Sequence, residues 1–135
     1  MEQEQIFSRF SETEYKRREA VVRRGMEARG LDAMVIAGDS GGRGANQANV
    51  YWLTNWVDVM VNYVVMTRTR GPFLFVSYPL YLHTAKRAGR AETIEWGQLN
   101  PGGDIAKRLI DLGLAMAPIN RSRRDRCASP GRRAE

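Results

Sequence analysis

The pattern of apolar and polar positions at the start of the chain predicts an amphipathic helix. Ser11 and Glu14 have the spacing of a capping box, in which the Ser11 hydroxyl accepts from the Glu14 N–H and the Glu14 carboxylate reaches back to Ser11. We expect the helix to cover residues 12–29 and Gly30 to end it. Its apolar stripe is formed by Tyr15, Val22 and Met26.

Continuous apolar runs then predict a sheet. The first run, residues 33–37, follows the helix directly and predicts a buried strand. Similar runs predict strands over residues 50–53, 59–69 and 73–77. Their connections are short, so we expect an antiparallel meander that is covered by helices on at least one face.

The second half of the sequence predicts two helices with a strand between them. Pro79 is placed to begin a helix over residues 79–88, and charges alternate with apolar residues over 92–96, as is typical of an edge strand. Asp104 can cap a further helix that ends at Gly113. The predicted fold class is α/β, with a mixed five- to six-stranded sheet that contains an antiparallel meander and is flanked by helices.

Composition divides the chain into three parts: an N-terminal extension over residues 1–10, a globular domain over 11–114 and an Arg-rich tail over 115–135. The tail has six Arg against Asp125 and Glu135, which accounts for +4 of the total charge of +6. Arg, Ser, Ala, Pro and Gly dominate it without periodicity, so we expect it to be disordered or translated out of frame. A basic tail can bind nucleic acid, but no recognised binding module accompanies it, and we do not expect that function.

The cysteine count and the length of the apolar runs predict a cytoplasmic protein. The single cysteine, Cys127, cannot form an intramolecular disulfide, and this fits a reducing compartment. No apolar run approaches the roughly 20 residues that span a bilayer, so we expect no membrane contact.

Candidate chemistry within the chain is sparse. Residues 38–42 read Gly-Asp-Ser-Gly-Gly, as around the nucleophile of chymotrypsin-like proteases, but the one histidine, His83, follows this serine and the chain is too short for two barrels. The same loop lacks a phosphate-binding glycine pattern. His83 has no carboxylate three or four residues away on its predicted helix, so we expect no catalytic residue, metal site or cofactor in this chain.

Residues 49–56, Asn-Val-Tyr-Trp-Leu-Thr-Asn-Trp, resemble the Asn-x-x-Tyr-Leu-Thr-Gly-Phe signature of one family's N-terminal domain. That family contains creatinase, prolidase and aminopeptidase P, the pita-bread metallopeptidases. Tyr51, Leu53 and Thr54 match the signature, Asn55 replaces its glycine, and Trp56 replaces its phenylalanine. The Gly-Leu-Asp-Ala sequence of residues 30–33 between helix and strand adds support, and the resemblance covers residues 11–114 with a ribonuclease H-like architecture.

The resemblance implies a role without catalysis. The family's hydrolysis depends on two divalent metal ions held by two Asp, one His and two Glu in a second, C-terminal domain, which we do not expect in this chain. In dimeric members the N-terminal domain closes over the active site of the other subunit. The resemblance therefore implies an inactive N-terminal domain that contributes to dimerisation and substrate access, with a homodimer mate and the catalytic domain of a full-length homologue as partners.

The residues that the resemblance places on the substrate side, or at an interface, are Tyr51, Thr54, Asn55, Trp56 and Asp58. Trp52 and Trp56 can equally be core aromatics, because aromatic side chains bury large areas. The alternatives are a stand-alone protein-interaction module that dimerises through a sheet edge or these tryptophans, and a nucleic-acid-binding domain that uses the basic tail.

Overall fold

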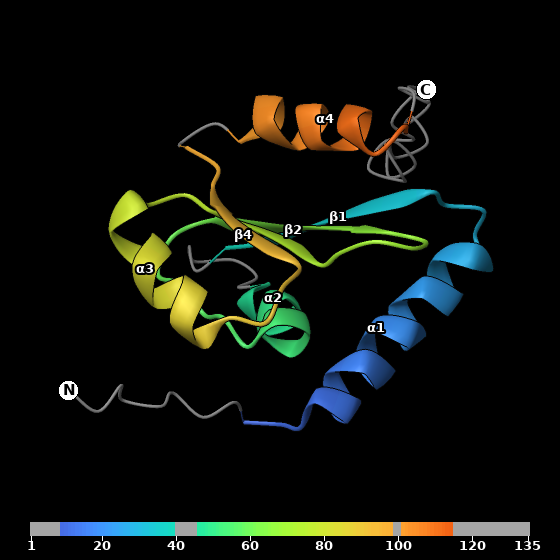
Figure 1. The fold of residues 1–135 in the computed structure, drawn as a ribbon, viewed down its shortest axis with the longest axis horizontal. Helices are drawn as coiled ribbons and strands as arrows, with labels where there is room; N and C mark the ends of the chain where they lie inside the picture. The colour runs from blue at the N-terminus through green and yellow to red at the C-terminus, as the bar shows by residue number, and fades with distance from the viewer. Residues whose placement is uncertain (1–8, 40–45, 99–100, 115–135) are drawn as a thin grey trace, which may run out of the picture.

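The computed structural model describes residues 9–39, 46–98 and 101–114 (Figure 1). In these ranges the chain forms four helices and four strands, which alternate along most of the sequence. Their bounds are α1 Glu12–Glu27, β1 Ala33–Gly38, α2 Gln47–Thr54, β2 Asn62–Thr67, β3 Phe73–Val76, α3 Pro79–Ala88, β4 Thr93–Trp96 and α4 Gly102–Asp111. The predictions for the Arg-rich tail and for Ser40 lie outside the described residues.

The described strands form one mixed sheet in the order β1-β2-β3-β4. The first three are antiparallel neighbours, and β4 pairs parallel to β3, with Val64 opposite Leu74 and Leu74 opposite Ile94. The predicted α/β class, mixed sheet and edge strand are therefore confirmed. The antiparallel strands are β1, β2 and β3, whereas the predicted meander included residues 50–53. The described sheet has four strands, whereas five to six were predicted.

The prediction of a strand over residues 50–53 was wrong, and this accounts for the missing strand. These residues lie in helix α2, where Val50, Leu53 and Thr54 share one face and are buried. Spacings of three and four residues place this face against the sheet. The β-branched and aromatic residues in the run favour a strand locally, but burial against the sheet overrides that weak preference.

Helix α1 begins as predicted but pairs its charges differently. The Ser11 hydroxyl accepts from the Glu14 N–H at 3.2 Å, which confirms the cap. The Glu14 carboxylate does not return to Ser11; it accepts from Arg17 at 2.7 Å and from Arg18 at 2.8 Å. The helix ends at Glu27, two residues earlier than predicted, and Gly30 follows with a φ of 65°.

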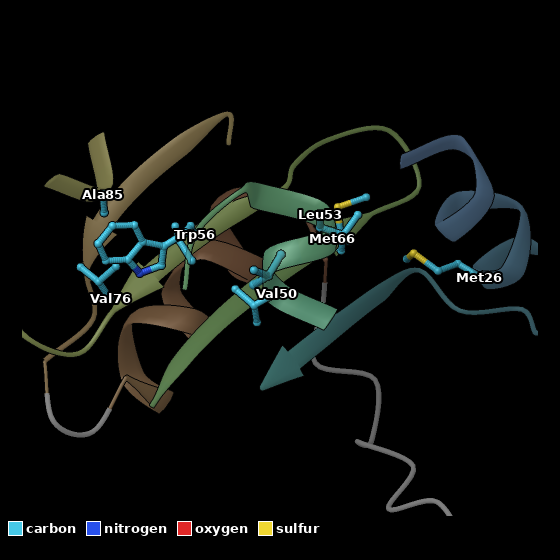
Figure 2. Packing of buried hydrophobic residues seen from close by; sticks show 9 residues of the cluster. Met26, Val50, Leu53, Trp56, Met66, Val76 and Ala85 are labelled. Atoms are coloured by element: carbon cyan, nitrogen blue, oxygen red, sulfur yellow. The ribbon is translucent and has the colours of Figure 1, made fainter. Parts of the chain in front are cut away.

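Two apolar layers lie on opposite faces of the sheet. Helices α2 and α3 cover one face and α4 covers the other (Figure 1). The larger layer, shown in Figure 2, joins Met26 of α1 to residues of α2, the sheet and α3, and it includes Trp56 and Ala85. The smaller layer packs Ile105 of α4 against Val65, Phe73 and Phe75.

The last helix differs slightly from its prediction. Helix α4 begins at Gly102, so Asp104 lies in its first turn instead of capping it. A carboxylate in that turn still interacts favourably with the positive end of the helix. Gly113 follows the helix with a φ of 74°, in agreement with its predicted role as a stop. Across the described ranges, no helix is long and apolar enough to cross a bilayer.

Candidate functional site

The residues proposed from the sequence gather where α2 ends, and Asn55 forms the turn there. Its φ of 58° and ψ of 12° are left-handed, a conformation that asparagine adopts more readily than most residues. Its side-chain Oδ1 accepts from the Tyr15 hydroxyl at 3.1 Å, and its Nδ2 donates to the Ala88 carbonyl at 2.9 Å. Asn55 therefore provides the backbone conformation that a glycine would allow and also links α1, α2 and α3.

Thr54 supports the same turn from inside the protein. Its buried hydroxyl donates to the Val50 carbonyl at 2.7 Å and accepts from the Trp56 N–H at 3.3 Å. Its carbonyl accepts from the Arg90 N–H at 2.6 Å. These partners satisfy the hydroxyl and the carbonyl of Thr54, so Thr54 holds the turn and its side chain is not exposed. Tyr51, one helical turn earlier, is half-buried.

Trp56 and Asp58 point into the protein. The Trp56 side chain is 7% exposed and its Nε1 donates to Asp58 Oδ2 at 3.4 Å. Asp58 is 3% exposed, and its Oδ1 accepts from the Met60 N–H at 2.9 Å. Gln47 completes the network: its Nε2 donates to the Met60 carbonyl at 2.8 Å, and its Oε1 accepts from Asn62 Nδ2 at 3.1 Å. The sequence-based interpretation missed Gln47 and Asn62, because their contact depends on α2 packing against β2.

This network holds a short apolar segment on the surface. Val57 is 55% exposed, Val59 69% and Met60 40%, while Asp58 between them is buried. We call residues 57–60 the braced segment. The usual arrangement of polar residues outside and apolar residues inside is reversed here, and exposed apolar groups of this kind mark contact surfaces. The sequence-based interpretation included only Asp58 of these four residues.

Trp52 contacts a buried arginine that the sequence-based interpretation also missed. Arg18 of α1 is 6% exposed and its Nη1 donates to the Trp52 carbonyl at 2.9 Å. Its guanidinium lies 4.0 Å from the ring centre of Phe10 and 5.2 Å from that of Trp52. Because the cation is paired with Glu14 and surrounded by aromatic rings, it joins α1 to α2 as a structural contact.

A groove of about 480 Å³ lies beside α1 and is lined by residues that include Glu12, Glu19 and Glu92. Each of these carboxylates forms an ion pair: Glu12 with Arg90, Glu19 with Arg23, and Glu92 with Arg70. The hydrogen bond from Arg70 lowers the pKa of Glu92, and the Gly71 N–H contributes in the same direction. Arginine side chains therefore hold all three carboxylates along this groove.

The described residues contain no group of three or more His, Cys, Asp or Glu side chains that could hold a metal ion. His83 is exposed on α3. The two carboxylates that the sequence places in loops differ in environment: Asp39 is exposed, whereas Asp58 is buried in the network described above.

Comparison with known proteins identifies the fold. No protein-family model and no curated protein matches the chain. Among solved structures, an Xaa-Pro aminopeptidase from Streptococcus pyogenes is similar, with a TM-score of 0.59 and 19% sequence identity over 77% of this chain and 71% of that chain. The structural match is consistent with the N-terminal domain of the creatinase family, the resemblance seen in residues 49–56, and at this identity it shows a shared fold.

Proposed function

We propose that this chain acts as the non-catalytic N-terminal domain of a metallohydrolase of the creatinase or Xaa-Pro peptidase type. In this role it contributes to dimerisation and to substrate access. The observation that carries the proposal is the fold shared with an Xaa-Pro aminopeptidase over 77% of the chain. The left-handed turn at Asn55 supports it, because the corresponding position of the signature is glycine, the residue best suited to that conformation.

The braced segment is the part of the surface that we assign to substrate access. It follows the Tyr-Leu-Thr-like signature directly, at the position that faces the partner's active site in dimeric members of the family. Its backbone is held by Asp58 and Gln47, so little conformational entropy is lost when it is covered. Val57, Val59 and Met60 would form an apolar wall for the substrate, while Trp56, Asp58 and Asn55 act by holding that wall in place.

The chemistry itself belongs to a catalytic domain in this proposal. Two divalent metal ions there would activate a water molecule and polarise the scissile carbonyl. This chain would supply no ligand to them, so the purified chain is expected to bind neither Mn²⁺ nor Zn²⁺ stoichiometrically and not to cleave an Xaa-Pro dipeptide. Calorimetric titration and a peptidase assay measure both. Metal-dependent cleavage above background by the purified chain would contradict the proposal.

A chimera tests the positive half of the proposal. Residues 1–114 of this chain replace the N-terminal region of an Xaa-Pro aminopeptidase, and hydrolysis of an Xaa-Pro peptide is measured with metal bound. We expect more activity than the catalytic region has alone. Val57→Asp should raise KM, whereas Ile110→Asp, which changes an equally exposed residue on α4, should not. A folded, metal-loaded chimera with no more activity than the catalytic region would refute the assigned role.

Self-association without a catalytic domain is the second candidate function, and the exposed apolar residues of the braced segment favour it. Trp56 is not the residue with which to test it: its side chain belongs to the core, and Trp56→Ala would cost about 3–5 kcal/mol of stability. Nucleic-acid binding by the basic tail, the other alternative, is untested. Retention on a DNA column that falls steeply with salt and vanishes on deletion of residues 115–135 would support it.

A further inference from the structure

The outer edge of β1 is one of the two open sides of the described sheet. Among the described strands, β1 pairs with β2 alone, over all six residues from Ala33 to Gly38. A strand that pairs on one side only directs alternate backbone N–H and C=O groups outward, and these groups can pair with a further strand. The outer edge of β1 can therefore accept an extended segment.

The residues of β1 are those of a strand that lies inside a sheet. All six are uncharged and none is proline, whereas edge strands often carry a charge, a proline or a bulge that prevents further pairing. The opposite edge strand, β4, does carry a charge, at Glu95. The sequence predicts a buried strand over residues 33–37, yet Val35 is 46% exposed and Ala37 is also exposed. Strand β1 thus has the side chains of an interior strand at the position of an edge.

The connections between parallel strands indicate which edge the chain approaches after α4. Helix α3 joins the parallel neighbours β3 and β4 and lies on one face of the sheet, whereas α4 follows β4 and lies on the other face (Figure 1). Connections between parallel strands of one sheet are right-handed in nearly all proteins. Because α4 is on the second face, a parallel strand after it must lie back across the sheet from β4. The first free position in that direction is the outer edge of β1.

Helix α4 leads toward that edge. In its first half Ile105 packs against residues of β2 and β3. Leu112 and Leu114, which follow the helix, line a cavity of about 110 Å³ together with Asp32 and residues 67–70. Asp32 immediately precedes β1, so Leu114 lies near the start of β1. A segment that continues from Leu114 along this edge would run in the same direction as β1.

The sequence after Leu114 has the length and character that this edge requires. Residues 115–120 are Ala-Met-Ala-Pro-Ile-Asn, six residues without a charge, and the arginines begin at Arg121. Six extended residues span roughly 20 Å, as the six residues of β1 do. Pro118 has no N–H to donate, so a strand that contains it tolerates the proline only where that position faces away from its neighbour. Residues 115–120 lie outside the described part of the chain.

We propose that the outer edge of β1 is a strand-binding site and that residues 115–120 of the same chain occupy it, parallel to β1. Because Pro118 faces away from β1, the N–H groups of residues 115, 117 and 119 point toward it, and those of residues 116 and 120 point away. The expectation of disorder then applies to residues 121–135 alone. The inference does not depend on the proposed enzymatic role.

The test is amide hydrogen exchange of the full chain, measured by NMR for the individual residues of β1. An open edge would leave about half of these amides unprotected, because alternate N–H groups point outward. We expect all of them to be protected. Ala117→Pro removes an N–H that faces β1 and should speed exchange of the outward-facing β1 amides about tenfold or more, since a hydrogen bond contributes up to about that factor. Asn120→Pro, which removes an N–H that faces away, is the matched control and should leave exchange unchanged.

A second measurement needs no substitution. In the wild type, nuclear Overhauser contacts should connect backbone protons of residues 115–119 with those of β1, and their absence would overturn the proposal. Equal effects of Ala117→Pro and Asn120→Pro on β1 exchange would also overturn it, as would a wild type in which alternate β1 amides are unprotected. A second copy of the chain is the competing occupant. Protection of β1 that rises with protein concentration over a hundredfold range would identify that occupant and refute pairing within one chain.

Discussion

Substitutions at Asn55 can separate how much its backbone conformation and its side-chain hydrogen bonds each contribute to the stability of the protein. Asn55→Ala leaves a residue with a Cβ at a φ of 58° and removes both side-chain hydrogen bonds, to Tyr15 and Ala88. Asn55→Gly removes the same two bonds but places at the turn a residue that, like asparagine, tolerates the left-handed conformation. Tyr15→Phe removes the first bond alone and keeps the packing of the ring.

The expected magnitudes follow from these differences. A left-handed residue with a Cβ costs about 1–2 kcal/mol, and each hydrogen bond contributes about 1 kcal/mol. Asn55→Ala should therefore lower the free energy of unfolding by about 3–4 kcal/mol, Asn55→Gly by about 2 kcal/mol and Tyr15→Phe by about 1 kcal/mol. The order of the three values matters more than their sizes.

Urea unfolding followed by tryptophan fluorescence measures the free energy of unfolding of all three variants. The values are comparable when that free energy falls with urea concentration at the same slope in each variant. Gln98→Gly is a control for the backbone contribution, because Gln98 has a φ of 55° and an exposed side chain; it should be neutral or stabilising. The reasoning is refuted if Asn55→Gly is as destabilised as Asn55→Ala, since the left-handed conformation would then cost alanine nothing. It is also refuted if Asn55→Ala lowers stability by less than about 1 kcal/mol, because the two bridging bonds would then be without effect.

Two further predictions concern packing and pH. Gly38→Ala should lower the free energy of unfolding by about 1–3 kcal/mol, because a Cβ there would lie 2.9 Å from Val50 Cγ2 and would also meet the Asn62 amide. The matched control is Gly103→Ala, where a Cβ meets nothing within 4 Å. Equal effects of the two substitutions in urea unfolding would disprove the close approach at Gly38. Hydrogen bonds from Arg17, and next from Arg18, lower the pKa of Glu14 from 4.5 to about 2, so its stabilising contribution is complete above pH 4.5 and is lost as the pH falls toward 2. The difference in melting temperature between wild type and Glu14→Gln should therefore shrink over that interval, and a constant difference from pH 7 to 2 would contradict the assignment.

Local signals were sufficient for several elements. The Ser11 cap, the left-handed glycine after α1 and the continuous apolar run of β1 are each specified by residues that are close in sequence. Pro79 begins α3 and Gly89 follows its last residue, because proline suits the first turn and glycine the end of a helix. The alternation of charged and apolar residues placed β4 at an edge of the sheet, where it is found.

The candidate site was identified in part by its sequence. The signature drew attention to residues 51–58, and Asn55, which replaces its glycine, adopts a left-handed conformation of the kind that glycine suits. The sequence could not show that Asp58 and Trp56 face inward. Their direction follows from Gln47 and Asn62, which lie 11 and 15 residues from their partners in this network.

The sequence by itself determined where most helices and strands begin and end, because caps, turns and apolar periodicity act between neighbouring residues. Only the tertiary structure decided that residues 50–53 are helical, since Val50 and Leu53 gain more from burial against the sheet than their strand preference is worth. It also decided which apolar residues stay outside. Leu80 and Trp96 resemble core residues in the sequence, and they are exposed because the sheet ends beside them.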